Sequence, residues 1–101
     1  MARFDVYKNK RGNPPLLCQI QATYHDHFDS RVVIPMQPFR QAAKEFKAAL
    51  TPRVMIDEGE YLLMTADMAT VSVKHLGKKV GSLEKYHYDI TSAVDFLFQG
   101  F

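Results

Sequence analysis

Two histidines and two aspartates lie within five residues of each other, and such side chains are common ligands of metal ions. His25 and His27 stand two positions apart, with Asp26 and Asp29 close by. Histidines at positions i and i+2 face the same way only on a strand, and no third ligand follows at a spacing usual for zinc. We therefore expect a solvated loop here, and we predict neither a metal site nor a cofactor.

The remaining candidates for acid–base or nucleophilic chemistry do not form a recognisable set. His75 and His87 are isolated in the sequence, and a lone histidine near apolar positions is more often structural than catalytic. The sequence contains no glycine-rich phosphate loop, no GxSxG nucleophile motif and no CxxC pair. The chain is therefore not expected to be an enzyme, since a catalytic site would have to be assembled entirely by the fold.

Positive charge gathers in a short segment near the start of the chain. Lys8, Lys10 and Arg11 are followed by a glycine and two prolines, which oppose regular structure. Such a loop is either a charged hairpin tip that keeps a small domain in solution or a docking site for an acidic partner. Lys78 and Lys79 are also expected in a solvated loop. The net charge of +2, without an aromatic-interleaved RNA motif, gives no reason to expect nucleic-acid binding.

Length and composition indicate a small globular protein. The chain has 101 residues, 47% of them apolar and 24% charged, close to the averages for folded domains. One domain over residues 1–101 is expected, with a thin core that dimerisation would extend. Cys18 is the only cysteine, which favours a reducing compartment, and we expect the cytoplasm. The sequence has no run of about 18 apolar residues and no hydrophobic leader, so we expect neither a membrane span nor export.

The elements that must position these side chains are mostly strands. Alternating or β-branched apolar residues predict six of them, over residues 3–7, 16–22, 32–34, 54–56, 61–64 and 71–73. Pro35 is expected to end the third strand. Residues 57–60 contain Gly59 and are expected to form the turn of a hairpin. The short spacings exclude parallel crossovers and predict an antiparallel barrel or sandwich over about residues 1–80.

Two segments show helical spacing instead. Residues 39–50 repeat apolar side chains at i, i+3, i+4 and i+7, and Pro52 prevents extension, so the local pattern predicts a helix there. A second helix is expected over about residues 83–99, with Ser82 as its N-cap and Gly100 just after its end. Its apolar stripe consists of Leu83, Ile90, Val94, Leu97 and Phe101. The last three residues would then protrude from the helix terminus.

Taken in order, several stretches resemble the CcdB family of toxins from toxin–antitoxin modules. They are Met1 with Phe4, Val6 and Tyr7, then Arg31–Pro35, Pro52–Ile56, Met64–Val71, Asp89–Ile90 and Phe98–Phe101. The stretch at residues 64–71 is the most specific. The order and total length agree with the family, and the resemblance spans nearly the whole chain.

The resemblance implies a mainly β fold of the α+β class. The expected architecture is a small antiparallel SH3-like barrel of the CcdB and MazF type, with an accessory sheet or loop region and one long C-terminal helix, assembled as a symmetric homodimer. Relatives carry irregular or short β structure where the local pattern predicts the helix at 39–50. Members of the family poison DNA gyrase by binding its A subunit and trapping the DNA-cleaved state. A partly disordered CcdA-like antitoxin neutralises them, and no catalysis by the toxin is involved.

The resemblance also implies which residues act. The end of the C-terminal helix is the gyrase-binding part of the family, which here comprises Asp95, Phe98, Gln99, Gly100 and Phe101. The basic loop, Lys8, Lys10 and Arg11, is the expected contact for an acidic antitoxin. The well-known toxin ends in Trp-Gly-Ile, whereas this chain ends in Gln-Gly-Phe. A tryptophan can stack on a guanidinium, for roughly 0.5–2 kcal/mol, while Gln99 can only form hydrogen bonds.

Three functions are open on the sequence alone. The first is a gyrase-directed toxin that acts by binding. The second is a family member that pairs with an antitoxin but no longer poisons gyrase, because Gln99 replaces the tryptophan. The third is an endoribonuclease like the MazF and Kid toxins. Those toxins share the fold, but a fold does not carry function, and the sequence offers no convincing acid–base pair.

Overall fold

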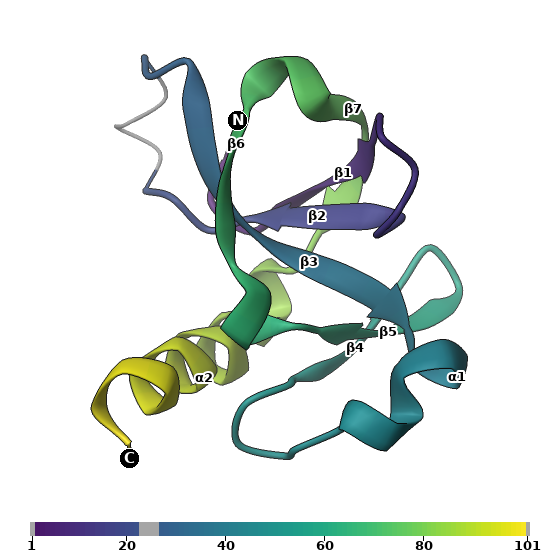
Figure 1. Ribbon diagram of the computed structural model, residues 1–101, viewed down its shortest axis with the longest axis vertical. Helices are drawn as coiled ribbons and strands as arrows, with labels where there is room; N and C mark the ends of the chain where they lie inside the picture. The colour runs from purple at the N-terminus through teal and green to yellow at the C-terminus, as the bar shows by residue number, and fades with distance from the viewer. Residues whose placement is uncertain (1, 23–26, 101) are drawn as a thin grey trace.

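One curled antiparallel sheet organises the chain, as the alternating pattern predicted. The structure is a computed structural model and describes residues 2–22 and 27–100. Its strands are β1 (Asp5–Asn9), β2 (Leu16–Gln19), β3 (Ser30–Pro38), β4 (Arg53–Ile56), β5 (Gly59–Leu63), β6 (Ala69–Ser72) and β7 (Leu76–Ser82). They are ordered β4-β5-β3-β2-β1-β7, with β6 also paired to β3 (Figure 1). No helix in the described ranges is long and apolar enough to cross a membrane.

The long strand β3 is the centre of the sheet, and it does not end at Pro35 as predicted. Its first half pairs with β6 and its last three residues pair with β5. Pro35 lies between these two pairings, where its carbonyl accepts a hydrogen bond from the Met64 N–H. A proline lacks an N–H, so it fits a strand at the point where the neighbour changes and no ladder donor is needed.

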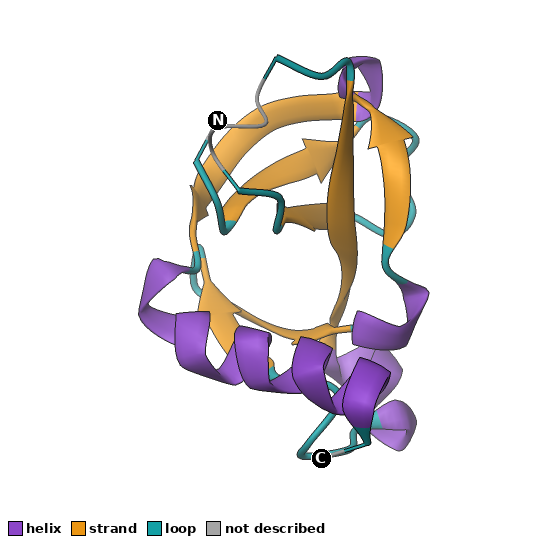
Figure 2. Cartoon of the chain, turned by 90° about the vertical axis from the view of Figure 1, so that its left-hand side faces the viewer, coloured by secondary structure: helices purple, strands orange, loops and turns teal. Residues whose placement is uncertain are grey.

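The sheet curls until its two outer strands approach each other, which gives the barrel-like shape. A Cβ atom added to Gly81 of β7 would lie 3.0 Å from Cδ1 of Ile56 in β4. The outer edge of β4 is capped by the Tyr86 hydroxyl, which accepts a hydrogen bond from the Met55 N–H at 3.0 Å. Figure 2 shows the curled strands with α2 (His87–Gln99) running across one end.

The main core lies between the inner face of this sheet and α2. Its buried side chains come from β1 to β5 and from the start of the C-terminal helical region; they are Phe4, Val6, Leu16, Cys18, Ile34, Met36, Val54, Ile56, Leu63, Leu83 and Ile90. A smaller cluster, Tyr7, Leu17, Val33 and Leu76, occupies the opposite face of the sheet. Both faces of β1, β2 and β3 are therefore covered, which explains the consecutive apolar residues within them, Val6–Tyr7, Leu16–Cys18 and Val32–Ile34.

The strand β7 was missed at the sequence level, and with it the environment of two lysines. Lys78 and Lys79 were expected in a loop, but they lie on β7, which pairs with β1 through an irregular register. Lys79 Nζ is 3.3 Å from Oδ1 of the buried Asp5. Gly77 lies 3.1 Å, measured from an ideal Cβ, from the Lys8 carbonyl. The two glycines and two lysines of β7 hide the alternation of apolar and polar residues that would mark a strand. The glycines lie next to close neighbours and do not mark a turn.

The helix predicted over residues 39–50 is wrong beyond its first turns. Only α1 (Phe39–Ala42) is α-helical, and a 3₁₀ turn continues it at Ala43–Glu45. Phe46 then has an extended backbone. The Thr51 hydroxyl accepts a hydrogen bond from the Lys47 N–H and donates one to the Lys47 carbonyl. This side chain closes a separate loop ahead of Pro52, so tertiary context overrides the helical pattern.

The C-terminal helix is confirmed, with its first turn tighter than expected. A 3₁₀ turn covers Glu84–Tyr86 before α2 begins at His87. The N-cap position of this turn is Leu83 and that of α2 is Tyr86, so the prediction of Ser82 as the N-cap is wrong by one residue. The Ser82 hydroxyl still accepts a hydrogen bond from the Glu84 N–H at 3.1 Å, from one position further back. Ile90 and Ala93 are buried. The position predicted for Phe101 on the stripe lies outside the described residues.

The hairpin between β4 and β5 is confirmed, but its glycine has another role than predicted. Asp57 and Glu58 form the two-residue loop and hold the positive φ angles, 50° and 64°, that a type I′ turn needs. Gly59 instead pairs with Ile56, and a Cβ there would lie 2.9 Å from Cε1 of Tyr61. A side chain at Gly59 would therefore require the Tyr61 ring to move.

This turn predicts a stabilising substitution. Glu58→Gly removes the strain of a side chain at positive φ and is expected to raise the free energy of unfolding by about 0.5–1 kcal/mol. Urea unfolding at fixed protein concentration measures the change. Glu58→Ala is the matched control, because it removes the carboxylate and keeps the Cβ, so it should give no gain. An equal gain from both variants would contradict the proposed cause.

Cys18 makes the stability of the protein sensitive to high pH. The thiol is fully buried, and burial, followed by the nearby Asp5 charge, raises its pKa from 9.0 to about 12. Above pH 9 the unfolded chain loses this proton first, so the folded state loses stability as the pH rises towards 12, by up to about 1.4 kcal/mol per pH unit. In Cys18→Val this part of the slope should vanish. Denaturant unfolding of both proteins between pH 8 and 11 tests it, and identical slopes would contradict it.

Candidate functional site

The end of α2 presents the residues that the resemblance assigned to the target. Helical spacing turns Ile90 and Ala93 into the core and leaves Phe98 71% exposed. Gly100 follows in the left-handed conformation, with φ of 79°, and its N–H donates to the Phe96 carbonyl at 2.8 Å. Nothing lies within 4 Å of an added Cβ there, so conformation alone favours glycine. Phe101 lies outside the described residues.

The charge of this helix end favours a cationic partner. The last turns of α2 contain no basic residue, and Asp95 is exposed beside Gln99. The unpaired carbonyls at a helix C-terminus add a partial negative charge. Phe98 adds an exposed aromatic ring. An acidic and aromatic surface of this kind suits a lysine or arginine side chain, which can pair with the carboxylate and lie over a ring.

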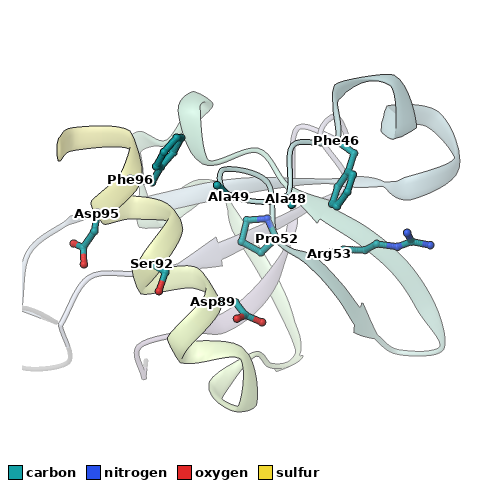
Figure 3. Close-up of a pocket in the computed structure, with 9 residues that line it drawn as sticks. All are labelled: Phe46, Ala48, Ala49, Pro52, Arg53, Asp89, Ser92, Asp95 and Phe96. Carbon is teal, nitrogen blue, oxygen red and sulfur yellow. The ribbon is translucent and has the colours of Figure 1, made fainter. Parts of the chain in front are cut away.

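A pocket of about 480 Å³ adjoins this helix end, between α2 and the chain at residues 46–53. The helix contributes Asp89, Ser92, Asp95 and Phe96, and the other wall consists of Phe46, Ala48, Ala49, Pro52 and Arg53. In Figure 3 Phe96 reaches towards Ala49, whereas Asp95 points away from the second wall, at the outer rim. The pocket therefore has an apolar floor and hydroxyl and carboxylate groups along its helical side.

The one cation of this pocket is already neutralised. The Arg53 side chain forms an ion pair with Glu60, which raises the pKa of Arg53, and lies 3.9 Å from the centre of the Phe39 ring. It points away from α2 in Figure 3. Asp89 and Asp95 have no ion-pair or hydrogen-bond partner among the described residues. The helical side of the pocket thus carries uncompensated negative charge.

The basic residues predicted to bind an antitoxin lie on the other side of the molecule. Lys8 is at the end of β1, and Lys10 and Arg11 follow in the β1–β2 connection, all three exposed. Figure 1 places this connection opposite the end of α2. An Arg11 Nη2 atom lies 3.0 Å from Nε2 of His75, and the Lys10 N–H donates to the His75 carbonyl. His75 therefore holds the basic loop against the chain ahead of β7.

The histidines and aspartates considered as metal ligands do not form a site in the described part of the chain. His25 and Asp26 lie outside it. His27 is exposed and contacts the Phe28 ring, while the Asp29 carbonyl accepts from the Val73 N–H. Within residues 2–22 and 27–100, no three His, Cys, Asp or Glu side chains come together as metal ligands would.

Neither wall of the pocket was predicted from the sequence, although the sequence contains a pattern that indicates the helical wall. Phe96 is six residues from Ile90, which on a helix of 3.6 residues per turn places it about 120° away from the buried face. Asp89 and Ser92 lie on the same flank, because Asp89 is three residues before Ser92 and Ser92 is four residues before Phe96. An aromatic residue outside the apolar stripe could have marked this flank. The opposite wall, from residues 46–53, could not be inferred while that segment was taken as a helix.

A comparison with known protein families matches nearly the whole chain. The sequence model that describes the CcdB protein family matches residues 3–100. This range contains the whole sheet, both walls of the pocket and α2 with Gly100. The chain therefore belongs to the CcdB family, whose members are toxins of toxin–antitoxin modules.

Proposed function

We propose that this toxin binds the A subunit of DNA gyrase through the end of α2 and traps the gyrase–DNA cleavage complex. The observation that supports the proposal is the exposed aromatic and acidic helix end, with Phe98 71% exposed beside Asp95, Gln99 and Gly100. A helix anchored by buried residues presents these groups with little conformational freedom to lose on binding. The toxin acts by binding and catalyses no reaction of its own.

The working form is a homodimer in the cytoplasm. A chain of 101 residues has a thin core, and Met55 on β4 and Tyr88 on α2 are 50% and 74% exposed. Burying such side chains between two copies would add the missing apolar contact. Sedimentation at micromolar concentration should therefore give twice the 11.6 kDa chain mass. A species of 11.6 kDa would contradict the dimer.

A CcdA-like antitoxin neutralises the toxin through the basic loop. Lys8, Lys10 and Arg11 are exposed and lie across the molecule from the end of α2. Their charge suits an acidic segment, and binding to them should weaken as salt is added. We expect the double variant Lys8→Glu with Lys10→Glu to lose antitoxin affinity while it still arrests growth.

The experiment that tests the proposed target is a gyrase cleavage assay. Purified toxin is incubated with gyrase, ATP and supercoiled plasmid, and linear DNA is scored after denaturation, with a known CcdB toxin as positive control. Linear product is the expected result. A folded dimer that gives no linear DNA would overturn the gyrase proposal. It would favour the second candidate, a toxin relative that keeps its antitoxin and has lost gyrase poisoning, for which Gln99 in place of tryptophan is the specific observation.

A further inference from the structure

We propose that the pocket between α2 and residues 46–53 receives an arginine side chain of the bound target. The inference rests on the proposed function in taking gyrase as that target, and it adds a second point of contact beside the helix end. Three features of the pocket support it: its size of about 480 Å³, its aromatic and apolar floor, and the uncompensated carboxylates on its helical side.

The floor of the pocket fits the stem and the flat head of an arginine. Ala49 and Pro52 offer apolar surface, and long charged side chains lay their methylene groups along such surface. Phe46 and Phe96 are 40% and 37% exposed, so part of each ring is open to a partner. A guanidinium stacks on an aromatic face more readily than an ammonium does, because it is planar and more weakly hydrated.

The helical side supplies acceptors and excludes an anion. Asp89 and Ser92 are neighbours on one flank of α2, and both side chains are exposed within the pocket. A carboxylate and a hydroxyl can accept from different N–H groups of one guanidinium, which donates five. Asp95 at the outer rim increases the negative field at the entrance. The charge of Arg53 does not oppose this field, because Glu60 pairs with it.

A small probe tests the pocket without any assumption about the target. N-acetyl-arginine amide is titrated into the ¹⁵N-labelled toxin, and amide shifts are followed by NMR, with the neutral isostere N-acetyl-citrulline amide as the control ligand. We expect saturable shifts at Phe46, Ala49, Asp89, Ser92 and Phe96, with an affinity on the order of millimolar. Equal shifts with citrulline, or shifts that are spread over the surface, would overturn the inference.

Charge variants then connect the pocket to the target. Asp89→Asn should weaken binding both to the arginine probe and to a purified gyrase A fragment by about threefold to fivefold. Asp57→Asn, at the β4–β5 turn, removes the same charge at a position where asparagine is well tolerated, and it should change neither affinity. Unchanged gyrase binding by the Asp89 variant would overturn the inference. Probe binding by the toxin without any gyrase binding would support the pocket and refute the proposed target, so the two failures are distinguishable.

Discussion

Removal of Gln99, Gly100 and Phe101 is expected to abolish growth arrest and leave the folded protein intact. Gly100 is exposed, and its one backbone hydrogen bond joins it to the last turn of α2. The free energy of unfolding should therefore change by no more than about 0.5 kcal/mol. Expression of the truncated toxin in sensitive cells gives the first measurement, and urea unfolding gives the second. A truncated protein that fails to fold would contradict the view that the helix end is separate from the core.

The departure at position 99 gives a companion variant that should gain activity. Gln99→Trp places a flat ring where the well-known toxin has one, and it should strengthen binding to gyrase by about tenfold to thirtyfold. Gln99→Leu is the matched control, because it adds apolar area without an aromatic face and should gain much less. Isothermal titration with a gyrase A fragment measures both. If the tryptophan brings no gain, the target contacts this toxin through other residues.

Local sequence patterns predicted those elements whose pattern is typical of only one kind of secondary structure. The stripe of Ile90, Val94 and Leu97 could only belong to a helix covering a core, and Gly100 after it could only mark the helix end. The alternation in β1 and β2 likewise identified strands. The predicted bounds of these elements agree with the observed ones to within a few residues at each end.

The predictions were wrong where a residue served a distant neighbour. Lys78 and Lys79 were expected in a loop, but they lie on β7, where Gly77 and Gly81 leave room for the Lys8 carbonyl and the Ile56 side chain. Pro35 looked like the end of a strand, but it marks a change of partner along β3. The helical pattern at residues 39–50 failed for a more local reason, because the Thr51 side chain bonds to the Lys47 backbone and holds residues 47–51 in a loop. None of these contacts can be inferred from spacing.

The candidate site also has one part that the sequence could place and one part that it could not. The position of the helix end could be predicted from the sequence, because Phe98 and Gly100 lie at the end of one element. Its role in binding the target stays a prediction. The pocket joins α2 to a loop more than thirty residues earlier in the chain. Its charge balance depends on Glu60, which neutralises Arg53 from a third segment. Such a combination requires the tertiary structure.

The anchoring of α2 leads to the largest stability effect that we predict. Ile90 is 1% exposed and is the one large side chain of α2 that lies in the main core. Ile90→Ala should lower the free energy of unfolding by about 2–5 kcal/mol, because it removes buried methyl and methylene groups and leaves a cavity. A domain of this size has a total stability on the order of 5–15 kcal/mol, so the loss is a large share of it.

This variant also tests whether function depends on the rigid placement of the helix. Tyr88→Phe is its control for stability, since Tyr88 is 74% exposed on the same helix and this variant keeps the ring that dimerisation would bury, so it should change the free energy of unfolding by about 0.5 kcal/mol at most. Urea unfolding is measured at one protein concentration, because dissociation of a dimer would add to the apparent stability. Gyrase binding by Ile90→Ala should fall further than its folded fraction does, because a loosened α2 must be ordered again on binding. Binding that falls only in proportion to the folded fraction would show that the helix end works without a fixed position.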